Sequence, residues 1–340
     1  MIETIASRPF GDIQTAVVTL VDRLAPAVAV ARQPDVAQEI ARVIASRPSS
    51  MARSMFIRQS IIRRGTASHD DLVQGLAAWV TVLFDLGNLQ HDRKRALRLA
   101  ATIAEDDVAR LSRAIARSPN GCILAVPHAG SLELFAAHLA DRGFNVGFVY
   151  TIGKSPTPTE EWIYRGRSAI RGTGIPFGRR QTGDTIAQVL ADNGVVIMVV
   201  DVYPSDQYQG IRVDIHDAAF NYPPGPARFA RSGTLVLPGT ASRRNADGFA
   251  MQIGDPLDYP GHLPTEPAGA AFTQSLAARI EGFTTRAPEA YWLWHPIPND
   301  PFLAVARGQR PDLLQGLAAT PADDEETALA VEAMRLKPAA

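Results

Sequence analysis

The chain has 340 residues, with 34 Lys and Arg against 35 Asp and Glu, and a formal net charge of −1. A charge so evenly balanced gives no global basic field for binding nucleic acid or an anionic membrane surface. With 46% hydrophobic and 20% charged residues, the composition is that of a globular protein and excludes the disordered and collagen-like classes. This length allows either two domains or one elaborated α/β domain.

The cysteine count and the N-terminal sequence bear on the cellular compartment. Cys122 is the only cysteine, which excludes a disulfide framework and any zinc site built on several thiolates, and fits a reducing compartment. Arg8 is the only basic residue before position 20, and no apolar stretch of signal length follows it. The longest apolar runs, 24–31 and 195–200, are too short to span a bilayer. We therefore expect no transmembrane segment and a cytoplasmic location, either free or peripheral to the inner membrane.

Two zones of predicted structure follow one another along the chain. Residues 12–117 are predicted to be helical, because segments such as 35–45 and 70–86 carry apolar residues at positions i, i+3, i+4 and i+7. From residue 120 onward, short β-rich runs alternate with helical patterns; the predicted strands are 122–126, 146–150, 195–200, 235–237 and 250–253. This alternation predicts an α/β fold with a mostly parallel central sheet flanked by helices, covered by an N-terminal helical layer.

The predicted organisation is one structural domain with three parts. Residues 1–117 are expected to form the N-terminal helical region that packs on the core, and residues 118–300 the α/β core. Residues 301–340 are expected to be a C-terminal tail, because they are rich in Ala and carry the acidic run 323–326. Within the core, Ser131 is predicted to cap a helix that ends at Gly143.

His128 stands where a buried strand is expected to end and a helix to begin, and Glu133 follows five residues later. Side chains at the carboxyl end of a strand in an α/β sheet emerge where ligands bind. The pair predicts a general base and its orienter, in which Glu133 accepts the proton of one imidazole nitrogen and the other nitrogen takes a proton from a hydroxyl or amine. Gly130 and the backbone amides near Ser131 are candidates for stabilising an oxyanion. The alternative is an ordinary loop histidine and a glutamate that only complements the helix dipole.

The His-x4-Glu spacing after a short apolar strand resembles the H-x4-D/E motif of the lysophospholipid acyltransferase superfamily. Within it, the sequence is most similar to the bacterial lipid A late acyltransferase branch, the lauroyl and myristoyl transferases. Further stretches resemble that family's motifs and follow in its order; they are residues 147–150, 164–180, 194–201, 237–248 and 288–295. The resemblance covers residues 120–300 and rests on the order of the motifs more than on any single one.

The resemblance implies a glycerolphosphate acyltransferase-like fold and acyl transfer from a thioester to a hydroxyl or amino group. The donor is acyl carrier protein or coenzyme A, a co-substrate and partner, with no permanently bound cofactor and no metal. A thioester carbonyl is already activated, so the enzyme needs chiefly a base, an oxyanion stabiliser and orientation. Two alternatives of the same class are hydrolysis of the thioester and a Ser/His acyl-enzyme that uses Ser131. An apolar tunnel is expected beside His128.

Seven further residues are candidates for donor or acceptor binding: Arg165, Arg167, Arg179, Arg180, Asp201, Arg243 and Arg244. Clustered arginines suit an acidic carrier protein or the phosphates of coenzyme A. The resemblance implies that Asp201 positions the acceptor or the pair Arg243 and Arg244. The alternatives are a solvated loop for the arginines of residues 165–180 and pairing with internal carboxylates for Arg243 and Arg244. Residues 291–295 are predicted to form a strand on which Tyr291 and His295 share one face, and its tryptophans are expected to pack in the core.

Three features depart from the family pattern. Thr151 stands where the family has an arginine, Pro296–Pro301 replaces a basic run, and a hydrophobic anchor at the start is missing. These features hold a phosphorylated glycolipid and its membrane, so we expect a different acceptor, such as an alcohol or amine of specialised metabolism. A peripheral enzyme that acts on a membrane lipid, and a non-catalytic acyl- or lipid-binding protein of the same fold, remain as alternatives.

Overall fold

A computed structural model describes residues 10–46, 50–64, 67–151, 156–201, 210–216, 218–230, 233–243, 248–257 and 267–292. At its centre lies a six-stranded sheet with the order β3-β2-β4-β1-β7-β8. The strands are β1 (Cys122–Val126), β2 (Val146–Thr151), β3 (Thr173–Phe177), β4 (Val195–Val199), β7 (Leu235–Arg243) and β8 (Phe249–Ile253). β1 pairs in parallel with β4 and β7, and β2 with β3 and β4, whereas β8 pairs antiparallel with β7. The predicted mostly parallel α/β sheet is confirmed.

Sequence predicted the inner strands better than the others. β1 and β4 are continuous apolar runs because helices cover both faces of the parallel sheet. β3 was not predicted; it carries Gly174 and Pro176, which weaken the strand pattern and are tolerated at a sheet edge. The hairpin of β5 (Ile211–Ile215) and β6 (Ala218–Tyr222) was also missed, and it forms a separate two-stranded sheet.

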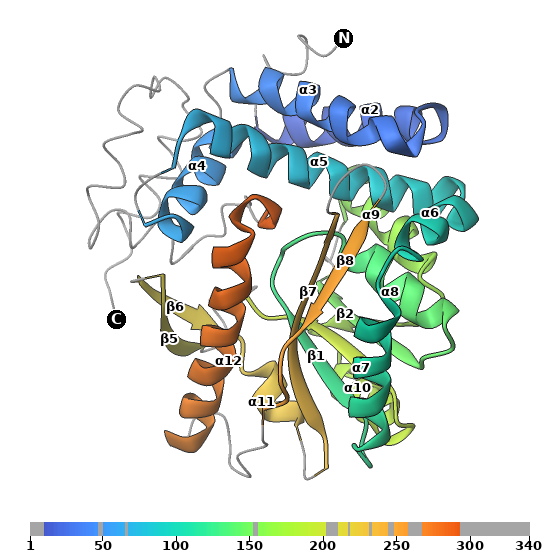
Figure 1. Cartoon of the computed structure of the whole chain (residues 1–340), viewed down its shortest axis with the longest axis vertical. Coiled ribbons are helices and arrows are strands. Elements are labelled where there is room, and N and C mark those ends of the chain that lie inside the picture. Colours follow the sequence, from blue (N-terminus) through green and yellow to red (C-terminus); the bar gives the residue numbers. More distant parts are fainter. Residues whose placement is uncertain are drawn as a thin grey trace.

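The N-terminal helices lie across one end of the sheet (Figure 1). They are α2 (Phe10–Ala27), the 3-10 turn η1 (Val30–Arg32), α3 (Gln33–Ala45), α4 (Ser50–Ile62), α5 (His69–His91) and α6 (Arg93–Ala100). The next helix, α7 (Glu105–Ala116), runs alongside the sheet and packs against β8. The covered end is the carboxyl edge of the parallel strands, because Ser131, which follows β1, donates a hydrogen bond to Asp85 on α5. The N-terminal layer therefore reaches the edge at which α/β proteins bind ligands.

The remaining helices flank the two faces of the sheet. They are α8 (Leu132–Asp141), α9 (Pro158–Ser168), α10 (Thr182–Ala191), α11 (Gly225–Phe229), α12 (Pro267–Arg286) and the 3-10 turn η2 (Pro288–Ala290). α8 begins after Ser131 and is followed by Gly143 in the left-handed conformation, as predicted. The side chain of Ser131 does not cap the helix, since its hydroxyl is bonded to Asp85.

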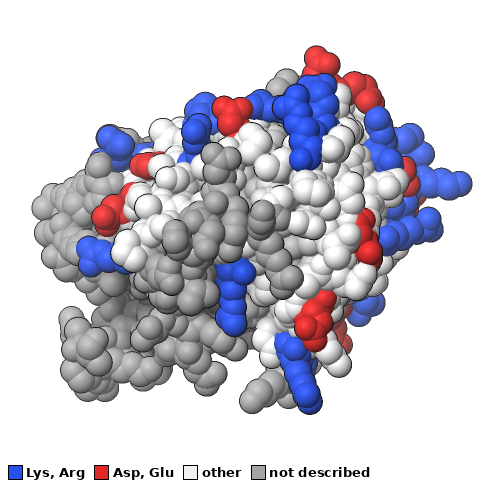
Figure 2. Space-filling view, turned by 90° about the horizontal axis from the view of Figure 1, so that it is seen from below, with Lys and Arg blue, Asp and Glu red and all other residues white. Residues whose placement is uncertain are grey.

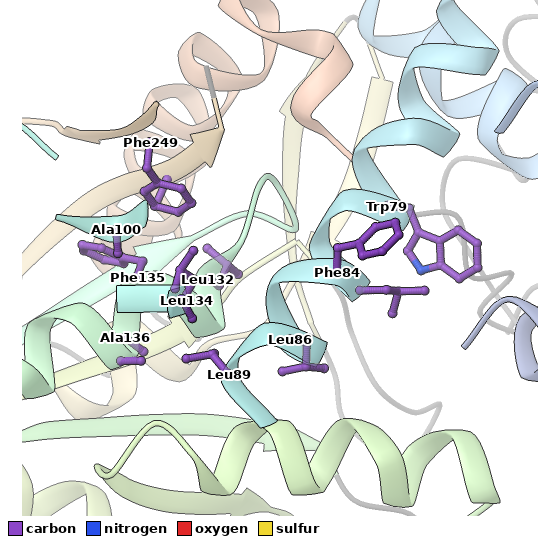
Figure 3. Packing of buried hydrophobic residues seen from close by; sticks show 14 of the residues in the cluster. Trp79, Phe84, Leu86, Leu89, Ala100, Leu132, Leu134, Phe135, Ala136 and Phe249 are labelled. Atoms are coloured by element: carbon purple, nitrogen blue, oxygen red, sulfur yellow. The ribbon is translucent and has the colours of Figure 1, made fainter. Parts of the chain in front are cut away.

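Two hydrophobic clusters hold these layers together. One joins the N-terminal helices to α8 and one face of the sheet; Figure 3 shows Phe84 and Leu89 of α5 near Leu132 and Leu134 of α8. The other cluster packs α10, α11 and α12 on the opposite face. Residues 10–116 and the α/β core thus share one continuous apolar interior, whereas the predicted tail 301–340 lies outside the described residues.

Helix α5 is long and apolar enough to cross a membrane by length and composition, the one such helix in the described ranges. A search of the sequence for uninterrupted apolar runs does not detect this helix, because polar residues such as Asp85 and Asn88 lie within it. About 78% of its apolar window is buried in the structure, and Asn88 exchanges hydrogen bonds with Gln33 of α3 at 2.9 and 3.2 Å. Since the core helix of a globular fold passes the same test, this is weak evidence for a membrane span.

Candidate active site

His128 lies at the carboxyl edge of the sheet, directly after β1, and lines a cavity of about 210 Å³. Its Nδ1 is 2.7 Å from Asp201 Oδ1, and its backbone N–H donates to Asp201 Oδ2 at 2.7 Å. Asp201 follows β4, the parallel neighbour of β1, so both residues emerge side by side. Two bonds to one carboxylate fix the ring and the backbone of His128 together.

The Asp201 carboxylate is buried, with only 4% of its side chain exposed. Burial by itself would raise the pKa of Asp201, but the charge of His128 and the hydrogen bonds from His128 and Tyr291 hold that pKa below its usual value. An ionised carboxylate can only accept, so Nδ1 of His128 carries a proton. In the neutral ring Nε2 is then free of hydrogen and can accept a proton.

The expected hydrogen bond between His128 and Glu133 is absent from the described contacts. Instead, His128 pairs with Asp201, and Glu133 pairs with Arg167. Glu133, in the first turn of α8, accepts from Arg167 Nε of α9 at 3.1 Å. The Arg167 guanidinium also lies over the rings of Phe148 and Tyr150, at 5.8 and 5.4 Å from their centroids. The carboxylate that contacts the His128 ring is thus that of Asp201, which was expected to position the acceptor. The five-residue spacing did not predict this contact, because Asp201 comes from a neighbouring strand.

Gly130 does not present its amide to the cavity. Its N–H donates to Ala290 O at 3.0 Å and its carbonyl accepts from Trp292 Nε1 at 2.8 Å. The residue has φ +68°, and a Cβ here would lie 1.7 Å from Ala241 O. Glycine is needed for the close approach of this turn to β7, and not for the approach of a substrate or for an oxyanion contact.

Ser131 and Arg243 both contact Asp85 on α5. Ser131 donates its hydroxyl to Asp85, and Arg243 Nε lies 3.4 Å from the other carboxylate oxygen. Burial raises the pKa of Asp85, although the Arg243 charge and the Ser131 hydrogen bond act in the opposite direction. Arg243 thus pairs with a carboxylate inside the fold, which was the alternative to substrate binding. The Ser131 hydroxyl faces α5 and does not support an acyl-enzyme. Arg244 lies outside the described residues.

The other predicted arginines are not brought together around His128. Arg167 lines the cavity, whereas Arg165, Arg179 and Arg180 are exposed. Arg179 and Arg180 follow β3, close in sequence to Phe177 at the cavity wall. Figure 2 shows basic and acidic side chains interspersed on the face away from the N-terminal helices, in agreement with the balanced net charge.

The cavity beside His128 has a polar end and a larger apolar part. His128, Glu133 and Arg167 supply the polar end. The apolar lining comes from several elements: Phe148, Val149, Phe177, Ile186, Met198, Val199, Pro226 and Phe229. Met198 and Ile186 belong to the apolar cluster around α10 and α11, so the cavity continues from the α8 side toward that face. Such a lining suits a hydrocarbon chain.

The segment after α12 closes the site from the other side. Trp292 N–H donates to His128 O at 3.0 Å, and the two rings meet edge to face with centroids 5.1 Å apart. Ala129 and Tyr291 form an isolated antiparallel bridge. Trp292 packs against the hydrophobic core, as expected, and also lines the cavity. Its position in an aromatic run gave no signal for the second role. His295 lies outside the described residues.

A histidine held by a buried carboxylate, beside an apolar cavity on a parallel sheet, defines a candidate enzyme for a lipid-like substrate. The chain belongs to the bacterial lipid A biosynthesis acyltransferase family, whose model matches residues 72–297. It is also 26% identical over 183 residues to phosphatidylinositol mannoside acyltransferase of Mycolicibacterium smegmatis (strain ATCC 700084 / mc(2)155). That match covers 52% of this chain and 56% of the relative, so it spans about half of each. The resemblance found in the sequence is confirmed: the chain is a member of this acyltransferase family.

Proposed function

We propose that this protein transfers a fatty acyl chain from a thioester, carried by acyl carrier protein or coenzyme A, to a hydroxyl or amino group. The observation that carries the proposal is the His128 and Asp201 pair, with its 2.7 Å contact, beside the apolar cavity. The cavity takes the acyl chain, and the thioester carbonyl lies at the polar end near His128.

In the proposed reaction His128 is the general base. Asp201 holds the Nδ1 proton, so Nε2 takes the proton of the acceptor O–H or N–H while that oxygen or nitrogen attacks the thioester carbonyl. The tetrahedral intermediate then collapses, the carbon–sulfur bond breaks, and the protonated His128 returns its proton to the leaving thiolate. No covalent acyl-enzyme is required.

Oxyanion stabilisation falls to groups other than Gly130, whose N–H is bonded to Ala290. The first-turn amides of α8 at Leu132 and Glu133 have no partner within the helix, and both residues line the cavity. The Arg167 guanidinium is a second donor at the same end, and Glu133 acts as the positioning residue that holds it. Fixed donors of this kind stabilise a developing negative charge without reorganisation.

The acceptor is proposed to differ from phosphorylated lipid A, because Thr151 and Pro296–Pro301 replace arginine-bearing segments. A peripheral reaction on a membrane lipid is the second candidate, favoured by the relative named for phosphatidylinositol mannosides. In either case the proposed location is cytoplasmic, free or peripheral to the inner membrane. A carrier that only binds acyl chains would need no oriented base, so the His128 and Asp201 geometry favours turnover.

The test is thiol release from lauroyl, myristoyl and palmitoyl donors, on coenzyme A and on acyl carrier protein. Acceptors are phosphatidylinositol mannosides, a lipid A precursor, and long-chain alcohols and amines, with mass spectrometry of the product. We expect acceptor-dependent release that His128→Ala abolishes and His69→Ala, an exposed histidine on α5, leaves intact. Release that survives His128→Ala would refute the proposal, whereas release without an acylated product would indicate a thioesterase.

A further inference from the structure

Tyr291 occupies a buried position behind the candidate active site. It follows η2, is 3% exposed, and its hydroxyl donates a hydrogen bond to Asp201. Together with Asp201 and Tyr222 it lines a small cavity of about 10 Å³, which lies apart from the large one beside His128. Tyr291 is absent from the lining of the large cavity, so it reaches the reaction through Asp201 and not through a substrate.

Three donors contact the Asp201 carboxylate: the ring and the backbone N–H of His128, and the hydroxyl of Tyr291. His128 contacts Oδ1 through its ring and Oδ2 through its backbone N–H, both at 2.7 Å. A carboxylate can accept about four hydrogen bonds, so the Tyr291 hydroxyl adds a contact without displacing either. A third donor, from a different segment of the chain, further restrains rotation of the carboxylate.

The Tyr291 hydroxyl is suited to remain a donor. Burial, followed by the negative charge of Asp201, raises the pKa of Tyr291 well above its usual value, while the Arg58 charge acts in the opposite direction. The phenol is therefore neutral throughout the working pH range, and only a neutral phenol carries the proton that Asp201 accepts.

The backbone around Tyr291 is attached to the catalytic turn and to the N-terminal helices. Gly130 N–H donates to Ala290 O at 3.0 Å, and Trp292 N–H donates to His128 O at 3.0 Å. From α4, Gln59 Nε2 donates to Pro288 O at 3.0 Å and to Tyr291 O at 3.3 Å. The phenol is thus presented to Asp201 by a segment that is fixed on both sides.

We propose that Tyr291 is a positioning residue of the transfer reaction, which holds the Asp201 carboxylate in the orientation that aligns His128. The proposal rests on the proposed function. It extends the candidate site to the residues that follow α12. The hydrogen bonds from Gln59 of α4 to this segment then contribute to the alignment of His128. Because the hydroxyl acts on the base alone, its removal is expected to change kcat and to leave donor binding unchanged.

The test compares Tyr291→Phe with Tyr222→Phe, using palmitoyl-coenzyme A as the donor probe and thiol release as the readout. Tyr222 is the matched control, since it is 2% exposed and lines the same small cavity. The Asp201 charge, after burial, raises the pKa of Tyr222, but the hydrogen bonds that lower the pKa of Asp201 come from His128 and Tyr291. We expect Tyr291→Phe to lower kcat roughly 5- to 30-fold with KM within about twofold. Tyr222→Phe is expected to keep both constants within about twofold.

A double-mutant cycle shows whether the hydroxyl acts through Asp201. In the Asp201→Asn background we expect Tyr291→Phe to change the residual kcat less than about twofold, because the group that it positions is already lost. Equal losses in the two backgrounds, an unchanged kcat in Tyr291→Phe, or a Tyr291→Phe chain unfolded at 25 °C would overturn the proposal. These outcomes leave the proposed function intact, since only activity that survives His128→Ala refutes it.

Discussion

Two carboxylates stand at the carboxyl edge of the sheet, one after β4 and one in the first turn of α8. Asp201 is 73 positions from His128 and contacts it twice, whereas Glu133 is five positions away and contacts Arg167 instead. Both carboxylates are nearly buried, and each contacts a basic side chain. The carboxylate after β4 holds an imidazole ring, and the one at the start of α8 holds a guanidinium.

The difference teaches that contact in the sheet outweighs proximity in the sequence. A residue five positions along enters a helix whose first turn faces α9, so its side chain meets Arg167 there. A residue that ends the neighbouring parallel strand necessarily emerges beside His128, whatever its distance along the chain. The division of roles between the two carboxylates can be tested residue by residue.

Asp201→Asn is expected to have the largest effect. The amide keeps the shape of the side chain but loses the charge and can present a donor to Nδ1, which leaves the wrong tautomer at Nε2. We expect kcat for thiol release to fall roughly 10²- to 10⁴-fold. Asp184→Asn, an exposed acid on α10, is the control and is expected to keep full activity. A loss under tenfold in Asp201→Asn would show that His128 needs no carboxylate.

Arg167→Lys and Glu133→Gln are expected to have an intermediate effect. Lysine keeps the charge but lacks the Nε donor that Glu133 holds, and we expect kcat/KM to fall about 10- to 100-fold. Glu133→Gln is expected to cost about 10-fold, and the double variant less than the product of the two single losses. Arg113→Lys on α7 provides the control. If the losses multiply, the two residues act independently and Glu133 is not the positioning partner of Arg167.

Ser131→Ala is expected to alter stability more than turnover. Its hydroxyl faces Asp85, so removal leaves part of a buried carboxylate without its donor, at about 1–2 kcal/mol of unfolding free energy. We expect kcat within about threefold of wild type. Denaturant unfolding and thiol release measure the two quantities, with the exposed Ser112→Ala as control. A hundredfold loss of kcat without unfolding would restore the acyl-enzyme mechanism.

His138 on α8 provides the smallest test, because it is a buried histidine without a carboxylate hydrogen-bonded to its ring. Burial, and then the charge of Arg142, lower the pKa of His138, while Asp141 and Glu105 act in the opposite direction. A base with a lowered pKa in the folded state stabilises the fold above its unfolded pKa of about 6.5, and that contribution is lost as pH falls. We expect His138→Leu to reduce the drop in melting temperature between pH 7.5 and 5.5 by a few degrees. An unchanged drop would show that acid destabilisation arises elsewhere; His69→Gln is the exposed control.

The sequence by itself determined the fold class and the place of His128. The apolar runs 122–126 and 195–200 could only be central parallel strands, and His128 at the end of the first could only emerge at the carboxyl edge. Order along the chain also carried the family resemblance, since the motifs that compose it are local. Edge strand β3 was not predicted, because Gly174 and Pro176 weaken its strand pattern. The β5–β6 hairpin was not predicted either, and it lies outside the main sheet.

Only the tertiary structure decided the partners. Asp201 after β4 and Trp292 after η2 both contact His128. Asp85 on α5 pairs with Ser131 and Arg243, which the sequence had associated with substrate. Gly130 is required by β7 and not by a ligand. The physical reason is that burial demands a partner for every polar group, and the partner is whichever group the packing of sheet and helices brings within reach. The local pattern located His128 at the end of a strand, but the strand order determined which carboxylate contacts it.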